Sequence, residues 1–165
     1  MRIVVVSDSH GEFTVLRQIL RKEEMFTDMF IHCGDSMVLK HEIRTYHVVK
    51  GNCDFFSDFP KHLTFDTPLG KIYVMHGEMG LINMKRLVAQ VKPDIILYGH
   101  THVHSYHNID GCHCLNPGSV SRPRDGKNGT YLVIEGTSKS NITWEFKSVV
   151  GLPQVKSQIG NQRIE

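Results

Sequence analysis

The chain has 165 residues, a formal net charge of +2 and 22% charged residues. This length suits one domain, and the composition excludes a disordered chain. The balanced charge argues against a protein dedicated to long nucleic acids. The four cysteines form no CxxC pair, and the apolar run after Met1 is too short for a signal peptide or a membrane span. We therefore expect a soluble, cytoplasmic protein with no membrane partner.

The first half of the chain alternates apolar strands with an amphipathic helix. The β-branched run Arg2–Val6 predicts a buried strand. Residues 12–24 predict a helix, because four apolar residues recur there at helical spacing: Phe13, Leu16, Ile19 and Leu20. Short apolar runs at 28–32 and 46–49 predict two further strands.

The middle of the chain continues the same alternation. Residues 62–65 and 71–75 predict a strand pair joined by a turn at Thr67-Pro68-Leu69-Gly70. Residues 83–91 predict a second helix, which Pro93 ends, and residues 95–98 predict another buried strand.

The last third is predicted to be mostly β structure. From His104 onward we expect short antiparallel strands, including residues 130–135 and 141–146. We assign residues 1–150 to a single domain and 151–165 to a polar tail. This much β structure exceeds one sheet with helices on both faces, so the predicted fold is α/β (α+β), with two packed sheets and helices outside.

Potential metal ligands follow five of the predicted strands. They are two aspartates, one asparagine and four of the 11 histidines: Asp8, His10, Asp35, Asn52, His76, His100 and His102. Ligands bind outside the carboxyl ends of strands in α/β sheets, so we expect these side chains to converge. The nitrogen-rich donor set suits Mn²⁺, Fe²⁺, Zn²⁺ or Ni²⁺ better than Mg²⁺ or Ca²⁺. Seven donors exceed the needs of one tetrahedral zinc and fit two ions that share a carboxylate, an arrangement used for hydrolysis.

The order of these motifs resembles that of the calcineurin-like metallophosphoesterases. The motifs are Asp8-Ser9-His10-Gly11, Gly34-Asp35, Gly51-Asn52-Cys53-Asp54, His76-Gly77 and Gly99-His100-Thr101-His102. The short length, the Asn-Cys-Asp block and Asn116-Pro117-Gly118-Ser119 are similar to the small YfcE-like branch of bacterial and archaeal phosphodiesterases. The resemblance runs from Arg2 to Phe146 and implies a four-layer α-β-β-α double β-sandwich.

The resemblance also implies two metal positions. Asp8, His10, Asp35 and His102 would hold the first ion. Asp35, Asn52, His76 and His100 would hold the second, with Asp35 bridging both. The implied activity is metal-dependent hydrolysis of a small phosphodiester by a metal-activated hydroxide, with Mn²⁺ as the expected ion and Zn²⁺, Fe²⁺ or Ni²⁺ as alternatives.

Further residues are candidates for contact with the substrate: Asn52, Cys53, Asn116, Gly118, Ser119 and Arg122. Many family members carry histidine at the position of Cys53. The thiol there either has a pKa lowered by nearby cations or is a small filler, and we favour the filler. Asp54 is either a partner of a ligand histidine or a turn residue.

Two other functions are weighed against the phosphodiesterase. One is a non-catalytic, protein-binding scaffold resembling the retromer subunit of the same fold, which the intact set of seven donors argues against. The other is a nuclease acting on short oligonucleotides. A homodimer is expected only from the general frequency of such assemblies.

Overall fold

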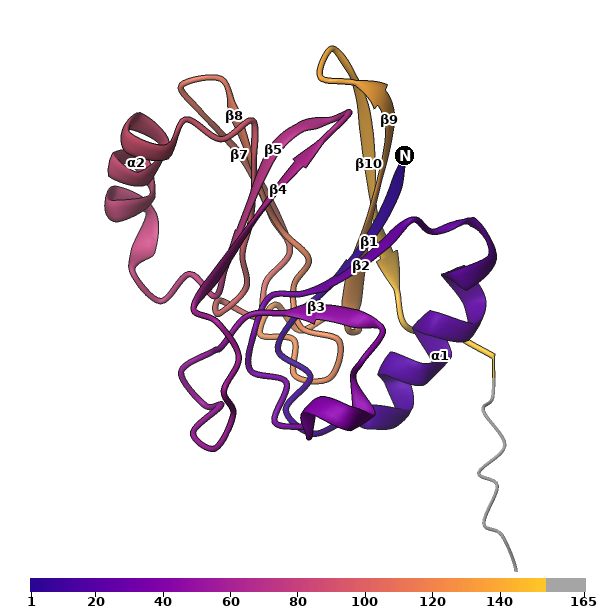
Figure 1. Ribbon diagram of the computed structural model, residues 1–165. Helices are drawn as coiled ribbons and strands as arrows, with labels where there is room; N and C mark the ends of the chain where they lie inside the picture. The colour runs from indigo at the N-terminus through magenta and orange to yellow at the C-terminus, as the bar shows by residue number, and fades with distance from the viewer. Residues whose placement is uncertain (154–165) are drawn as a thin grey trace, which may run out of the picture.

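The computed structural model describes residues 1–153 of the chain, and two five-stranded sheets form its framework (Figure 1). The first sheet has the strand order β10-β9-β1-β2-β3. Its strands are β1 (Arg2–Val6), β2 (Met29–His32), β3 (Tyr46–Val48), β9 (Thr130–Ser138) and β10 (Asn141–Ser148). Strand β1 lies at the centre, parallel to β2 and antiparallel to β9. Because both faces of β1 are covered, its sequence is a continuous apolar run instead of an alternating one.

The second sheet has the order β4-β5-β6-β8-β7. Its strands are β4 (His62–Thr67), β5 (Gly70–Met75), β6 (Ile95–Leu97), β7 (Ser105–Ile109) and β8 (Cys112–Asn116). Strands β4 and β5 form the predicted hairpin. Strand β8 departs from the antiparallel pattern expected after His104, because it inserts between β7 and β6 and runs parallel to β6.

One helix covers the outer face of each sheet, so the molecule has the predicted four layers. Helix α1 (Phe13–Glu23) packs Leu16 and Ile19 onto the first sheet. Helix α2 (Gly80–Val91) packs Met84 and Val88 onto the second. Figure 1 shows the two helices on opposite outer sides of the sheets. Two short 3₁₀ segments, η1 (Glu24–Phe26) and η2 (Lys40–Glu42), complete the described elements.

Helix α2 begins three residues before its predicted start at residue 83. Its first apolar side chains, Leu81 and Ile82, are 49% and 80% exposed and therefore lie outside the apolar stripe on which the prediction rested. At the other end, Lys92 adopts a left-handed conformation with φ 52° directly before Pro93, which ends the helix as predicted.

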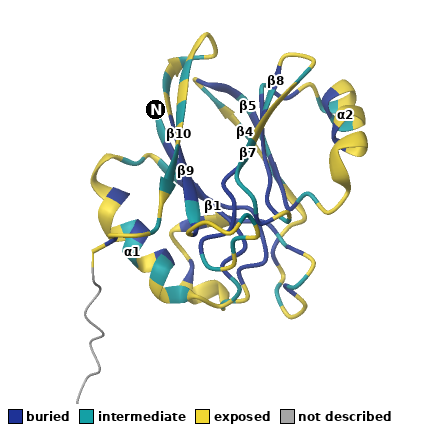
Figure 2. Ribbon diagram, turned by 180° about the vertical axis from the view of Figure 1, so that it is seen from behind, coloured by how far each residue is buried: buried dark blue, intermediate teal, exposed yellow. Residues whose placement is uncertain are grey.

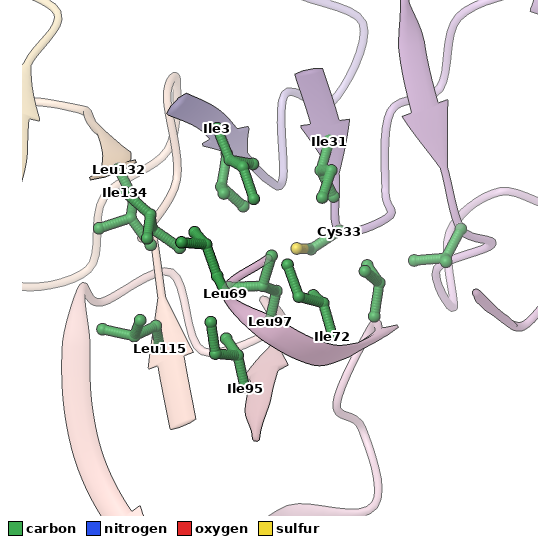
Figure 3. Packing of buried hydrophobic residues seen from close by; sticks show 13 residues of the cluster. Ile3, Ile31, Cys33, Leu69, Ile72, Ile95, Leu97, Leu115, Leu132 and Ile134 are labelled. Atoms are coloured by element: carbon green, nitrogen blue, oxygen red, sulfur yellow. The ribbon is translucent and has the colours of Figure 1, made fainter. Parts of the chain in front are cut away.

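The principal core lies between the two sheets. Figure 3 shows side chains from both sheets meeting there, among them Ile3 and Ile31 from the first and Ile95 and Leu97 from the second. All four are fully buried. In Figure 2 buried residues follow the strands, while exposed residues lie on the outer surfaces of the helices. Two opposed apolar sheet faces thus fix how the ends of the sheets lie relative to each other.

The end of the described chain is packed against the domain. Leu152 is 7% exposed and joins the cluster beneath α1, so the packed part extends past the predicted boundary at residue 150. The rest of the predicted tail, 154–165, lies outside the described residues. Within residues 1–153, no helix is long and apolar enough to cross a membrane.

Candidate metal centre

The seven predicted donors come together where loops leave the carboxyl ends of strands from both sheets. The loops after β1, β2 and β3 carry Asp8, His10, Asp35 and Asn52, and the loops after β5 and β6 carry His76, His100 and His102. These loops lie at one end of the double sandwich, in the lower part of Figure 1. The donors therefore follow the carboxyl ends of their strands, which is where the sequence predicted that they would converge.

One half of the cluster joins the first sheet to the second through Asp8, His10 and His102. The Nε2 atoms of His10 and His102 lie 3.2 Å apart. Asp8 Oδ1 lies 3.3 Å from His102 Nε2 and 3.9 Å from His10 Nε2. These three ligand atoms are close enough to hold one metal ion together.

The other half contains Asp35, Asn52, His76 and His100. His76 Nε2 lies 3.3 Å from Asp35 Oδ2 and 2.9 Å from Asn52 Oδ1. His100 Nδ1 lies 3.1 Å from the same Asn52 oxygen and 3.3 Å from His76 Nε2. Asp35 connects the two halves, because its Oδ2 also lies 3.9 Å from His10 Nε2.

The backbone at this cluster is held in an uncommon conformation. Five of the seven donors have positive φ: Asp8 (52°), His10 (46°), Asp35 (55°), His100 (71°) and His102 (62°). Residues other than glycine rarely adopt such angles, and sites that do so tend to be functional. The tight turns aim the side chains inward from loops that leave the strands directly.

Two glycines allow these loops to approach each other. A Cβ atom on Gly34, which has φ 99°, would lie 2.8 Å from His76 Nδ1. A Cβ atom on Gly99 would collide with the side chains of Ser7 and Asp8. Larger residues at these two positions would push the donors apart.

Asp54 fastens the loops that carry the donors. Its Oδ2 accepts hydrogen bonds of 2.8 Å from the N–H groups of Asp35 and Gly51, and its Oδ1 accepts one of 2.9 Å from the Met37 N–H. Asp54 is 3% exposed, and its carboxylate accepts these bonds from the backbone of the loops. Asp54 is therefore a turn residue, and the hypothesis that it is a partner of a ligand histidine is not supported.

A histidine for which no role was predicted supports the same loops. His32 is fully buried, its Nε2 lies 2.9 Å from Ser9 Oγ, and its Nδ1 accepts a hydrogen bond from the Gly34 N–H. Burial lowers the pKa of His32 to about 4, so the ring is neutral at pH 7. The position of His32 at the end of β2 could have indicated a role at this end of the sheet. The prediction took Asp35, three residues later, as the functional residue of this loop instead.

Backbone carbonyls orient two of the inward-facing imidazoles. His76 Nδ1 donates to the Cys33 carbonyl over 2.8 Å, and His102 Nδ1 donates to the Arg122 carbonyl over 2.7 Å. Because a carbonyl only accepts, Nδ1 carries a proton in both rings, and each ring turns an Nε2 lone pair toward the cluster once Nε2 has lost its proton. Such hydrogen bonds are typical of metal-binding histidines.

The electrostatics of the cluster demand a proton or a cation at its centre. Burial opposes the charged form of His76, but hydrogen bonding to Asp35 and the charge of Asp8 raise its pKa to about 9. Burial likewise opposes ionisation of Asp35, yet the His76 contact and the Cys53 N–H hold its pKa at about 2. Asp8 Oδ1 is the one buried side-chain oxygen or nitrogen of residues 1–153 that lacks a hydrogen-bond partner. Converging lone pairs and an unpaired buried carboxylate oxygen fit a divalent metal ion.

Three of the predicted substrate contacts lie inside the protein. Asn116 and Ser119 are 0% exposed, and Gly118 is also buried. The Asn116 side chain donates to the Gly99 carbonyl and accepts from the Gly118 N–H. Ser119 Oγ accepts from the Arg122 N–H over 2.8 Å. These residues shape the loop that carries the exposed Arg122, and they offer no free surface to a substrate.

Cys53 lies at the edge of the cluster, where its N–H donates to Asp35 Oδ1 over 2.7 Å. Burial and the charge of Asp35 raise the pKa of its thiol. The carboxylates around Cys53 therefore shift its pKa in the direction opposite to that of bound cations, and the filler stays the hypothesis that we favour.

Comparison with known proteins gives the class to which this fold and site belong. The calcineurin-like phosphoesterase superfamily domain matches residues 1–139, which include all seven donors. The chain is 35% identical over 141 residues to the probable metallophosphoesterase YsnB of Bacillus subtilis, covering 81% of this chain and 83% of that protein. It is 29% identical over 110 residues to the phosphodiesterase YfcE of Escherichia coli K12, covering 62% of this chain and 59% of YfcE.

A solved structure shows the same fold. A predicted phosphoesterase of Streptococcus pneumoniae TIGR4 superposes with a TM-score of 0.82 at 29% identity, covering 94% of this chain and 93% of that one. The chain is thus a phosphoester hydrolase whose His/Asp clusters suit divalent metal. It belongs to the calcineurin-like phosphoesterase superfamily and is similar to its small YfcE- and YsnB-like members.

Proposed function

We propose that this chain hydrolyses a small phosphodiester with the help of two divalent metal ions. The observation that carries the proposal is the convergence of the seven donors in one cluster, in which the buried Asp8 Oδ1 lacks a hydrogen-bond partner. The first ion would be held by Asp8, His10, Asp35 and His102, and the second by Asp35, Asn52, His76 and His100. The position of Asp35 Oδ2 between His76 and His10 supports its role as the shared carboxylate.

We keep Mn²⁺ as the expected ion because of the family resemblance, with Zn²⁺, Fe²⁺ and Ni²⁺ as alternatives, since a donor set this rich in imidazole nitrogen does not suit Mg²⁺ or Ca²⁺. Bound ions of this kind would lower the pKa of water and offset the negative charge that develops on the phosphoryl oxygens. The protein fixes the donors before any ion arrives, through the carbonyl partners of His76 and His102 and through Asp54.

Residues beside the cluster would hold the anionic substrate. Arg122 is exposed and lines a groove together with His10 and His102. A guanidinium group is suited to two hydrogen bonds with one phosphate group. Because Ser119 Oγ anchors the Arg122 N–H, the buried Asn116–Ser119 turn contributes by holding this arginine in place. Cys53 lines the groove wall, where it would act as a small filler.

The alternatives explain the site less well. A purely protein-binding scaffold needs no cluster of inward-facing lone pairs, and burying them without a cation or proton would destabilise the fold. A nuclease acting on long chains would need a wide positive surface, whereas the net charge is +2. A short oligonucleotide remains within the class of small phosphodiesters.

The test begins with metal-stripped protein reloaded separately with Mn²⁺, Zn²⁺, Fe²⁺ and Ni²⁺. We expect two ions per chain by elemental analysis and hydrolysis of bis-p-nitrophenyl phosphate, with slower hydrolysis of p-nitrophenyl phosphate. His102→Ala should lose bound metal and activity, and His47→Ala, at an exposed histidine of β3, should keep both.

The outcomes separate the parts of the proposal. A metal-loaded protein inert toward both esters contradicts the hydrolase of small diesters. A single ion per chain contradicts the two-metal arrangement while leaving metal-dependent hydrolysis in place. Faster turnover of the monoester than of the diester reverses the proposed substrate class.

A further inference from the structure

Two openings lie beside the metal centre and share part of their lining. The first, which we name the arginine groove, has a volume of about 550 Å³ and is lined by His10, Met37, Cys53, Phe55, His102, Arg122, Pro123 and Arg124. The second, which we name the phenylalanine pocket, has a volume of about 470 Å³ and lies between residues 37–42 and 53–58. Met37, Cys53 and Phe55 line both. Each volume suits a small molecule.

The phenylalanine pocket presents apolar side chains to water. Phe55 and Phe56 are 74% and 104% exposed, and Met37 and Leu39 are 52% and 63% exposed. A group of large apolar side chains exposed together favours a binding role over a structural one. Met37 ties the pocket to the metal centre, because its Sδ lies 3.4 Å from His10 Nδ1.

The two walls of the pocket are fixed to one another. The Asp54 carboxylate accepts from the Met37 N–H on one wall and belongs to the turn that begins the other wall. Across the pocket, Lys40 Nζ lies 3.5 Å from Asp58 Oδ2. The loops that follow β2 and β3 therefore form a preformed recess beside the donors, at the same end of the molecule in Figure 1.

The arginine groove supplies positive charge next to this apolar recess. Arg122 and Arg124 are both exposed, and the loop that carries them is fixed to His102 by two hydrogen bonds. An anion seated between these arginines and the metal donors would have one of its substituents pointing toward Phe55, which both openings share.

We propose that the phenylalanine pocket binds an aromatic ester group of the substrate, so that the preferred substrates are phosphodiesters with one flat aromatic substituent, such as an aryl group or a nucleobase. This inference rests on the proposed phosphodiesterase function. An aromatic ring stacks on exposed phenylalanine faces, whereas a methyl ester is too small to cover them. The neighbouring arginines attract the single negative charge of the diester.

The test measures binding directly, by calorimetry on the metal-loaded protein with dimethyl phosphate and methyl phenyl phosphate. We expect methyl phenyl phosphate to bind about tenfold more tightly, the size of effect that one stacked ring gives. Phe55→Ala should remove this preference and leave the affinity for dimethyl phosphate unchanged. Phe26→Ala is the matched control, because Phe26 is 75% exposed and lines an opening with Met1 and Arg2, away from the donors.

Three results would overturn the assignment. They are equal affinity for the two diesters, equal effects of the two alanine variants, and a Phe55→Ala variant that only converts a dimer to a monomer in sedimentation velocity. The last result would make the pocket an interface between copies of this chain. Hydrolysis of diesters without a preference for aromatic groups would contradict the role of the phenylalanine pocket and support the proposed phosphodiesterase function. Preferential binding of the aromatic diester without hydrolysis of any ester would support the pocket and contradict the phosphodiesterase function.

Discussion

The molecule buries carboxylates in two regions that differ in how their charge is met. In the first, which we name the Glu23 network, Glu23 accepts 2.7 Å hydrogen bonds from the Arg2 guanidinium and the Tyr131 hydroxyl, and Lys147 lies 3.4 Å away. In the second, the metal centre, Asp8 Oδ1 has no hydrogen-bond partner among the described residues, and its nearest charged neighbour is His102 Nε2 at 3.3 Å. Residues 1–153 supply every partner that the Glu23 carboxylate needs, whereas the metal centre needs a proton or a bound cation to balance its carboxylates.

The pKa values alone do not separate the two regions. Burial opposes ionisation of Glu23, but the bonds from Tyr131 and Arg2 lower its pKa, just as the contacts of Asp35 lower that of Asp35. The difference lies in the donors, because a guanidinium keeps its protons while an imidazole can release its proton to an incoming metal ion. A buried acid facing histidines is therefore the better sign of a metal site than a buried acid facing arginine.

The largest effect should follow from removing the carboxylate shared by the two halves of the metal centre. Asp35→Asn replaces one donor oxygen by an amide and should lower the turnover of bis-p-nitrophenyl phosphate about 100-fold or more, together with the bound metal. Asp66→Asn, at an exposed aspartate of β4, is the control and should retain both. An Asp35→Asn protein that kept two metals and its rate would refute the shared carboxylate.

A substitution in the Glu23 network should lower stability and leave activity unchanged. Glu23→Gln leaves Arg2 and Lys147 without their buried counter-charge and should lower the free energy of unfolding by about 2 kcal/mol, measured in urea. Metal content and turnover should be unchanged. Glu135 also contacts Arg2, over 2.6 Å, but its side chain is 56% exposed. Glu135→Gln should therefore cost less than about 0.5 kcal/mol, and equal losses in the two variants would contradict the role of burial.

The protonation of His76 gives a pH test of the same contrast. In metal-free protein its pKa is raised from 6.5 to about 9, so its contribution to stability is complete below pH 6.5 and is lost as pH rises through 9. Metal must displace this proton, so metal affinity should fall about tenfold for each pH unit below 9, with about one proton released from His76 at pH 8. Calorimetry in two buffers of different protonation enthalpy measures the release, and identical heats in both would contradict it.

The sequence predicted the parts of the structure in which residue type and position agree. The apolar run of β1 and the donors after five strands could be found because buried strands and metal ligands both restrict residue types. The insertion of β8 between β6 and β7 could not be predicted, because strand order depends on contacts far apart in the sequence. The buried turn at Asn116 and the support from His32 were missed for the same reason: the partner atoms are loop carbonyls and N–H groups, which no residue pattern records.

The smallest expected effect isolates one hydrogen bond of the Glu23 network. Tyr131→Phe removes the hydroxyl that donates to Glu23 Oε1 and should lower the free energy of unfolding by about 1 kcal/mol, because Arg2 and Lys147 still face the carboxylate. In combination with Glu23→Gln, the loss should be smaller than the sum of the two single losses, since both variants remove the same charge-assisted bond. Strict additivity in urea unfolding would show that the Tyr131 hydroxyl and the Glu23 carboxylate do not interact, and would contradict the network. Unchanged metal content in all three proteins would confirm that the Glu23 network and the metal centre act independently.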